Sequence, residues 1–294
     1  MAEQKADEEQ WTHHQAIING IRLHYVTAGE GPLVVLLHGF PEFYYSWRHQ
    51  IPALARAGFQ VVAPDMRGYN LSEKPAGVHN YRINALVEDV AALIKHMGAT
   101  QATVVGHDWG GAVAWAVPMT YPALVEKLVV LNAPHPGAFM RELRSREQLR
   151  KSWYILFFQI PILPELLIRS NKGALLGEML RTDPERAGAF TEEDIDRYVQ
   201  AINQPGALTG ALNYYRALFR QSPIQTMRSI RRIDTPTLLI WGEHDRYLGI
   251  RLTQNLGAWV PNLRLERIPQ SGHWVQAEAA DRVNELLIEF LAGS

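Results

Sequence analysis

The sequence predicts an α/β protein in which a mainly parallel sheet is flanked by helices and interrupted by a helical insertion. Short aliphatic runs alternate with amphipathic segments over most of the chain, and this alternation is typical of right-handed crossovers in one parallel sheet. The aliphatic runs are continuous, which indicates strands buried on both faces. About ninety residues before the last two strands lack this alternation, and a structureless loop of that length would be improbable in a compact protein.

The hydrophobic pattern predicts the elements in chain order. Two short alternating runs flank Asn19-Gly20 between residues 17 and 28, which predicts a hairpin. Six further strands are expected at residues 33–37, 60–63, 102–105, 128–131, 237–241 and 263–268. Helices are expected at residues 51–57, 81–97, 111–119 and 281–291, the second of them with apolar side chains at helical spacing.

The insertion is predicted to be a helical lid formed by residues 137–230, with residues 1–136 and 231–294 forming the core domain. Its most apolar stretch, residues 153–168, is interrupted by polar residues and prolines, so it is too broken to span a membrane. We expect this stretch to be an amphipathic segment buried within the lid. The alternative is a segment that lies on a membrane surface.

Composition excludes several functional classes. The chain is 47% hydrophobic and 20% charged with a formal net charge of −1, which gives no electrostatic reason to expect nucleic acid or a membrane as a partner. It has no cysteine, so thiolate chemistry and disulfides are excluded, and no HExxH-type motif suggests a metal. Residues 1–10 are polar and we interpret them as a loose tail of a cytoplasmic protein.

The segment Gly106-His107-Asp108-Trp109-Gly110-Gly111 has the G-x-nucleophile-x-G form, placed between a predicted buried strand and a helix. Small residues are needed there because the nucleophile lies on a strained turn where the two backbones nearly touch. Asp108 takes the position that serine has in esterases. By itself, Asp108 could equally be a helix N-cap.

A carboxylate nucleophile narrows the chemistry. It is ionised at neutral pH without a base and can displace a leaving group from a saturated carbon to form an ester on the enzyme. Attack on a carboxylic ester would instead form a mixed anhydride and expel an alkoxide. The turn therefore favours epoxide opening or dehalogenation over esterase, lipase or peptidase activity.

Two further candidate residues follow the last two predicted strands. Asp245 comes after residues 237–241 and His273 after residues 263–268. The order nucleophile, acid, histidine is that of a nucleophile-elbow triad, and the carboxyl ends of parallel strands meet at one edge of the sheet. We therefore predict Asp108 as nucleophile, His273 as base and Asp245 as the residue that orients it.

The segment His38-Gly39-Phe40-Pro41-Glu42 follows the first parallel strand. Its Phe40 N–H is predicted to form an oxyanion hole together with the Trp109 N–H. The Phe40–Pro41 bond is a candidate for the cis form. Two histidines near the site, His38 and His107, are expected to brace loops rather than transfer protons.

These segments together resemble the epoxide hydrolases of the α/β-hydrolase superfamily, over nearly the whole length after residue 10. The motifs that carry the resemblance are HGFPE at 38–42, PDMRGYNLSEKP at 64–75, GHDWGG at 106–111, NAPHP at 132–136, GEHD at 242–245 and SGHW at 271–274. The resemblance implies the α/β-hydrolase fold with a helical cap, and conversion of epoxides to vicinal diols without a cofactor. It further implies that Phe40, Pro41 and Trp109 line the substrate site.

The resemblance also implies an acid pair on the lid. Its motifs match at WYILFFQ, 153–159, and NYYR, 213–216, which implies that Tyr154 and Tyr215 protonate the epoxide oxygen. The chemical need is real, because an alkoxide leaves poorly unless a phenol delivers a proton. Tyr214 is the competing residue, since neighbours on a helix point about 100° apart and only one can face Asp108.

Two rival functions follow from the same residues. A haloalkane or haloacid dehalogenase shares the aspartate nucleophile. Haloalkane dehalogenases commonly carry an asparagine at the position of Phe40, and haloacetate dehalogenases carry arginines just after the nucleophile, where this chain has Trp109-Gly110-Gly111-Ala112. Both differences favour the epoxide hydrolase. A non-catalytic small-molecule receptor is the rival from another class. The expected partner is a small epoxide, with no nucleic acid or membrane, and the expected state is a monomer or homodimer.

Overall fold

The computed structural model describes residues 11–220 and 222–293, so the tail predicted at residues 1–10 lies outside the described residues. Eight strands form one sheet in the order β1-β2-β4-β3-β5-β6-β7-β8. They are β1 (Thr12–Ile18), β2 (Ile21–Ala28), β3 (Leu33–Leu37), β4 (Gln60–Pro64), β5 (Ala102–His107), β6 (Val125–Leu131), β7 (Thr237–Gly242) and β8 (Leu263–Ile268).

The sheet is mainly parallel, as predicted. Strand β2 pairs antiparallel with β1 on one side and with β4 on the other, whereas every pairing from β4 through β3 to β8 is parallel. Asn19 and Gly20 both have positive φ at the turn between β1 and β2, which is the backbone of a tight hairpin. The hairpin begins at Thr12 rather than at residue 17. The hydrophobic pattern does not mark the first residues of β1, because most of this strand is exposed and its hydrophobic alternation is weak.

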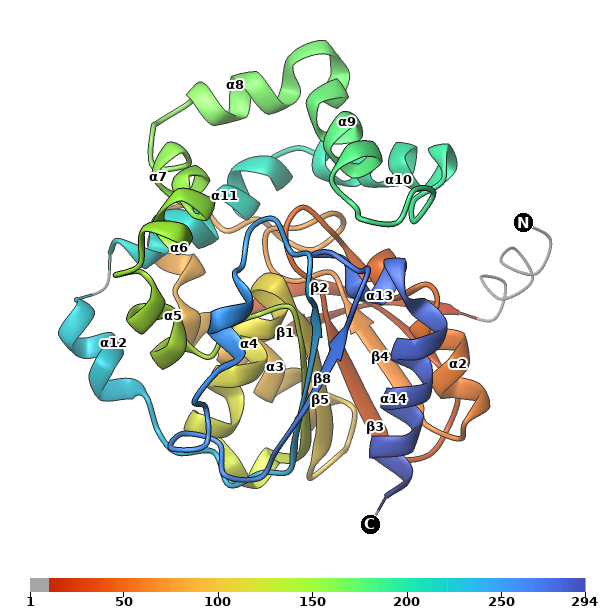
Figure 1. Cartoon of the computed structure of the whole chain (residues 1–294). Helices are drawn as coiled ribbons and strands as arrows, with labels where there is room; N and C mark the ends of the chain where they lie inside the picture. Colours follow the sequence, from red (N-terminus) through yellow and green to blue (C-terminus); the bar gives the residue numbers. More distant parts are fainter. Residues whose placement is uncertain (1–10, 221, 294) are drawn as a thin grey trace.

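Helices cover both faces of the sheet (Figure 1). The core helices are α2 (Gln50–Arg56), α3 (Ile83–His96), α4 (Asp108–Thr120), α13 (Val275–Glu278) and α14 (Ala280–Ala292). Short 3₁₀ turns lie at Tyr44–Trp47, Val78–Tyr81, Pro122–Leu124, Ser170–Gly173 and Ile250–Thr253. The central strand β3 is fully buried, in agreement with its continuous aliphatic sequence.

The long connection between β6 and β7 is helical. It contains α5 (Pro136–Glu142), α6 (Arg146–Lys151), α7 (Trp153–Phe157), α8 (Leu163–Arg169), α9 (Ala174–Thr182), α10 (Glu192–Ile202), α11 (Ala207–Leu218) and α12 (Pro223–Ser229). Figure 1 shows α7 to α11 above the carboxyl ends of the parallel strands, with α12 at one side. The division into a core of residues 1–136 and 231–294 and a lid of residues 137–230 stays a prediction.

The expectation that residues 153–168 form a buried amphipathic segment is met only in part: Phe158 and Ile168 are buried, but most of the large apolar side chains are not. Large apolar side chains of this stretch lie at the surface, with exposed fractions of 63% for Trp153, 67% for Ile162 and 62% for Leu166. The two helices here are short, and α8 buries only Pro164 and Ile168. In the part of the chain that the structure covers, no helix is long and apolar enough to cross a bilayer.

Candidate active site

Asp108 lies at the junction of β5, which ends at His107, and α4, which begins with Asp108 itself. Its φ is +50°, a left-handed conformation that is uncommon for a residue with a Cβ. A Cβ on Gly106 would lie 2.2 Å from the Gly110 carbonyl oxygen, and a Cβ on Gly110 would lie 2.1 Å from that of Leu37. The glycines are therefore required by the close approach of strand and helix.

The N-cap alternative for Asp108 does not hold. The N-cap residue of α4 is His107, and no side chain caps the helix. The Asp108 Oδ1 atom instead accepts a hydrogen bond of 2.8 Å from the Phe40 N–H. The Phe40–Pro41 bond is cis, and the Trp109 amide belongs to the first turn of α4, where N–H groups have no acceptor within the helix.

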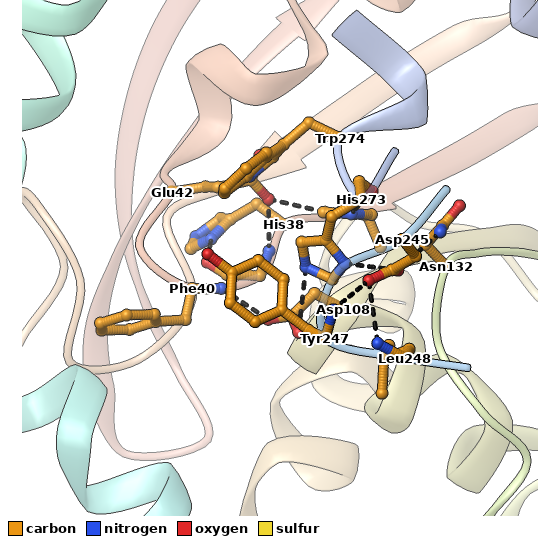
Figure 2. Close-up of polar contacts among 12 residues, drawn as sticks. His38, Phe40, Glu42, Asp108, Asn132, Asp245, Tyr247, Leu248, His273 and Trp274 are labelled. Atoms are coloured by element: carbon orange, nitrogen blue, oxygen red, sulfur yellow. Dashed lines mark hydrogen bonds and ion pairs between the residues drawn. The ribbon is translucent and has the colours of Figure 1, made fainter. Parts of the chain in front are cut away.

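His273 lies between two carboxylates (Figure 2). Its Nδ1 is 2.8 Å from Asp245 Oδ2, and its Nε2 is 3.6 Å from Asp108 Oδ2. A carboxylate only accepts hydrogen bonds, so the Nδ1 proton belongs to the bond with Asp245. In neutral His273, Nε2 is then the basic nitrogen, and it faces Asp108.

Asp245 is fully enclosed by donors. Its Oδ2 also accepts from the Asn132 amide at 2.7 Å, and its Oδ1 accepts from the backbone N–H groups of Tyr247 and Leu248 at 2.8 and 2.9 Å. Burial raises the pKa of Asp245, but the charge of His273 and these hydrogen bonds outweigh it and hold the pKa below its usual value. Asp245 therefore stays ionised and keeps His273 oriented.

The pKa of His273 is shifted in the opposite direction. Burial lowers it, but the charge of Asp245, the hydrogen bond to Asp245 and the nearby carboxylate of Asp108 raise the pKa well above its usual value. Part of this shift depends on Asp108 being ionised. Any reaction that removes the Asp108 charge will therefore lower the pKa of His273.

The two predicted lid tyrosines meet above this site. Tyr154 comes from α7 and Tyr215 from α11, with ring centroids 5.8 Å apart in an edge-to-face arrangement. Tyr215 also packs on the rings of Phe40 and Trp109 at 5.5 and 5.1 Å. Burial, followed by the charge of Asp108, raises the pKa of both phenols, so both carry a proton at neutral pH.

The structure also separates Tyr215 from its neighbour. The Tyr214 hydroxyl donates to the backbone oxygen of Arg67 at 2.8 Å, and its side chain is fully buried against the loop that follows β4. That hydroxyl is engaged with core backbone. Of the two, Tyr215 is the one whose environment includes the charge of Asp108.

The two histidines expected to brace loops do so. His38 Nε2 accepts from the Met66 N–H at 3.0 Å. His107 lies between Glu42 Oε2 and the backbone oxygen of His273, each at 2.8 Å. Burial raises the pKa of Glu42, but the charge and hydrogen bond of His107 lead the contacts that lower it to about 2. The Glu42–His107 pair thus ties the loop after β3 to the loop that carries His273.

Two residues outside the predicted set contribute to the site. Asn132, in the NAPHP motif, has a φ of +38° and accepts from the Gly242 N–H while it donates to Asp245. Tyr247 packs on His273 and Tyr154 at 5.2 and 5.6 Å and donates its hydroxyl to Asp183 of the lid. The motif signalled Asn132, but nothing in the sequence pairs Tyr247 with Asp183.

The remaining predicted residues are placed as follows. Pro41 is buried beside Phe40, while Phe40 and Trp109 are partly exposed and both contact Tyr215. Within residues 11–220 and 222–293, no group of three or more His, Asp or Glu side chains is arranged to hold a metal ion.

Comparison with known proteins identifies the family. The α/β-hydrolase fold family model matches residues 32–280. The chain is 44% identical to the AB hydrolase superfamily protein YfhM of Bacillus subtilis, over 93% of this chain and 95% of that protein. It is 39% identical to human epoxide hydrolase 4, over 93% of this chain and 76% of that protein.

The fold is also similar to solved structures. The epoxide hydrolase of Bacillus megaterium, solved in complex with an inhibitor, superposes with a TM-score of 0.88 at 33% identity, covering 95% of this chain and all of that one. The epoxide hydrolase of Vigna radiata superposes with a TM-score of 0.84 at 32% identity, covering 96% of this chain and 98% of that one. The chain therefore belongs to the α/β-hydrolase fold family and, within it, to the epoxide hydrolases.

Proposed function

We propose that the protein hydrolyses epoxides to vicinal diols through an ester formed on Asp108. The observation that carries the proposal is a carboxylate at the strained turn, 3.6 Å from the basic nitrogen of His273, beneath two tyrosines that keep their protons. A serine hydrolase needs its histidine for the first step, whereas a carboxylate does not. The tyrosines supply what an epoxide needs and an ester does not.

The first step forms the ester. Asp108 Oδ1 is held by the Phe40 N–H, which leaves Oδ2 to attack an epoxide carbon. The carbon–oxygen bond of the ring breaks, and the leaving oxygen takes a proton from Tyr154 or Tyr215. The product is a hydroxyalkyl ester on Asp108 and a tyrosinate that is later reprotonated.

The second step hydrolyses the ester. His273 Nε2 takes a proton from water, and the hydroxide adds to the ester carbonyl carbon of Asp108. The negative charge develops on Oδ1, where the amides of Phe40 and Trp109 receive it. When the intermediate collapses, the diol oxygen leaves with the proton that His273 carries, and Asp108 is regenerated.

Ester formation also activates the base. Before the reaction, the charge of Asp108 helps to hold the pKa of His273 well above its usual value. The ester carries no charge, so the pKa of His273 falls once the intermediate forms. His273 therefore becomes a better acceptor of the water proton at the stage where a base is required.

The proposal includes the expectations about substrate size, cofactor, partners, location and oligomeric state. The substrate is a small epoxide, no cofactor takes part, nucleic acid is not a partner, the protein is cytoplasmic, and its state is a monomer or homodimer. The packing of Phe40 against Tyr215 supports an epoxide over a halide, because an aromatic ring cannot donate the hydrogen bonds that a leaving halide needs.

The test is a His273→Gln variant incubated with styrene-type, aliphatic and fatty-acid epoxides. Ester formation needs no base, but hydrolysis does, so intact mass spectrometry should show protein heavier by one epoxide, with the label on the peptide that contains Asp108. An Asp108→Ala, His273→Gln double variant is the control and should carry no label. The absence of an adduct with an epoxide that the wild-type enzyme turns over would refute the division of labour.

A second experiment distinguishes an epoxide hydrolase from a dehalogenase. Wild-type protein is incubated with chloroacetate and a haloalkane, and halide release is measured beside diol formation. A haloacetate would have to lose hydration beside an anionic nucleophile without a cation as partner. Steady halide release that Tyr215→Phe leaves unchanged would overturn the epoxide assignment.

A further inference from the structure

The outer side of the lid carries a group of large apolar side chains with no cover. We call it the lid apolar face. Its most exposed members are Trp153, Leu156, Ile162, Leu166 and Phe219, with exposed fractions between 57% and 67%. Scattered exposed apolar residues are ordinary, but a group on neighbouring short helices marks an interaction surface.

Side-chain contacts join the parts of this face. Arg216, near the end of α11, donates to the backbone oxygens of Phe158 and Ile160 and forms a bidentate pair with Glu165 of α8. The end of α11, where Phe219 follows, is thereby fastened to the segment between α7 and α8. Figure 1 shows α8 along the outer edge of the lid, away from the sheet.

The backbone at Ile162 supports a role for the exposed side chain. Ile162 has a φ of +69° and a ψ of −40°, and a β-branched residue at positive φ is a genuine outlier. Its side chain is 67% exposed, so burial does not offset the cost of this conformation. Such outliers occur where a side chain is held in place for a contact.

The charges around the face are basic. Residues 144–169 contain five Lys or Arg and two acids, and residues 216–220 contain two Arg and no acid. Of these, Lys151 is directed inward and donates to the backbone oxygen of Asp245. Arg150, Arg169 and Arg220 are exposed. Among the described residues none of the three lies within ion-pair distance of an acid, and Arg169 acts on Glu165 only through its charge. One of the two acids, Glu165, is neutralised by Arg216.

The exposed apolar side chains and the basic border together indicate which kind of partner fits the lid apolar face. A second copy of the chain would place an equally basic border against this one, because a two-fold interface uses the same surface patch on both subunits, and the net repulsion between the two borders opposes that pairing. A lipid surface of negative charge instead matches both the apolar side chains and the basic border. A tryptophan at the edge of such a face suits the lipid–water boundary.

We propose that the lid apolar face docks the protein on an anionic lipid surface. The docking is peripheral, with the apolar side chains in the headgroup region and the arginines against lipid phosphates. It revises the expectation of no membrane partner, which relied on a net charge of −1; the local excess of arginine is hidden in that average. It is independent of the chemistry at Asp108.

The experiment is sedimentation of the full chain with vesicles of phosphatidylcholine alone or mixed with phosphatidylglycerol, at low and high salt. Wild-type protein should bind the anionic vesicles at low salt and be released at high salt. Arg150→Gln should weaken partitioning about fivefold, the ratio expected for one basic residue near an anionic surface. Ile162→Asn should weaken it about tenfold, since one large aliphatic side chain no longer enters the lipid.

The controls keep the result unambiguous. Asparagine occurs at positive φ more often than a β-branched residue does, so Ile162→Asn should fold at least as well as the wild type, as a thermal melt checks. Ile17→Ser and Lys95→Gln remove an exposed aliphatic chain and an exposed cation on β1 and α3, and both should bind as wild type does. The proposal is overturned if anionic vesicles do not bind, if the controls lose binding equally, or if the lid substitutions instead break a dimer.

Discussion

Replacing Asp245 with asparagine should disable one half of the catalytic cycle by changing a tautomer. Asp245 Oδ1 accepts from two backbone N–H groups, and Oδ2 accepts from Asn132 and from His273 Nδ1. In Asp245→Asn the amide oxygen stays with the two backbone donors, because an NH₂ group there would meet two N–H groups. The new NH₂ group therefore faces Asn132 and His273.

The consequence reaches the basic nitrogen. His273 Nδ1 must then accept a hydrogen bond, so the ring proton moves to Nε2, which faces Asp108 and can no longer take a proton from water. Loss of the general base is expected to slow ester hydrolysis by about 10²- to 10⁴-fold. Ester formation needs no base and should change much less.

The same substitution has a measurable effect on stability. The Asn132 amide would face another donor, and Asn132 cannot rotate without losing the Gly242 N–H, which its Oδ1 accepts at 2.9 Å. The Asn132 amide nitrogen would keep only its longer contacts with the backbone oxygens of Gly272 and Gly242, at 3.3 and 3.4 Å, and loss of its bond to the charged carboxylate costs about 1.5–3 kcal/mol. Urea unfolding of Asp245→Asn should show a loss of this size relative to the exposed control Asp234→Asn.

The assay is a single turnover with excess enzyme, in which intact mass follows the ester and chromatography follows the diol. In Asp245→Asn the ester should appear at a rate near that of the wild type and then persist. If the ester decays within tenfold of the wild-type rate, the tautomer argument is wrong. If the ester never forms, Asp245 acts on the first step, and the assignment of His273 to the second step alone fails.

Three further predictions concern the reacting groups. Asp108→Ala should fold, as circular dichroism checks, and form diol at less than about one ten-thousandth of the normal rate, since a nucleophile is worth many orders of magnitude. Tyr215→Phe and Tyr154→Phe should each slow ester formation by about 10²-fold or more in single turnover. Tyr214→Phe should leave that rate near normal. It should lower the free energy of unfolding by about 1 kcal/mol, because its hydroxyl no longer donates to the Arg67 backbone oxygen. In NMR titrations, the pKa of His273 should be lower in Asp108→Asn than in the wild type, because one charge that raises it is gone. Protonated His273 stabilises the fold below its unfolded pKa of about 6.5, and this stabilisation is lost as pH rises through the folded pKa, so it should be smaller in the variant. An unchanged pKa would refute the coupling between the two residues.

The sequence by itself determined the sheet, the turn and the order of the candidate triad. Continuous aliphatic runs predicted the buried strands because a parallel sheet is covered on both faces. The glycines around Asp108 were readable because two backbones nearly touch there. The positions of Asp245 and His273 followed from the topology, since loops after parallel strands open on one edge. These features depend on local pattern and chain order.

Only the tertiary structure decided which side chains meet across elements. Tyr214 and Tyr215 are equivalent in sequence, and the backbone oxygen of Arg67 on another element separates them. The donors around Asp245 come from the loop after β6 and from the turn after β7, a convergence that spacing does not encode. Exposure of the apolar side chains in residues 153–168 was likewise beyond the sequence, because burial depends on whether another element covers a helix face. In the described structure α8 buries Pro164 and Ile168, and its outer side is left open.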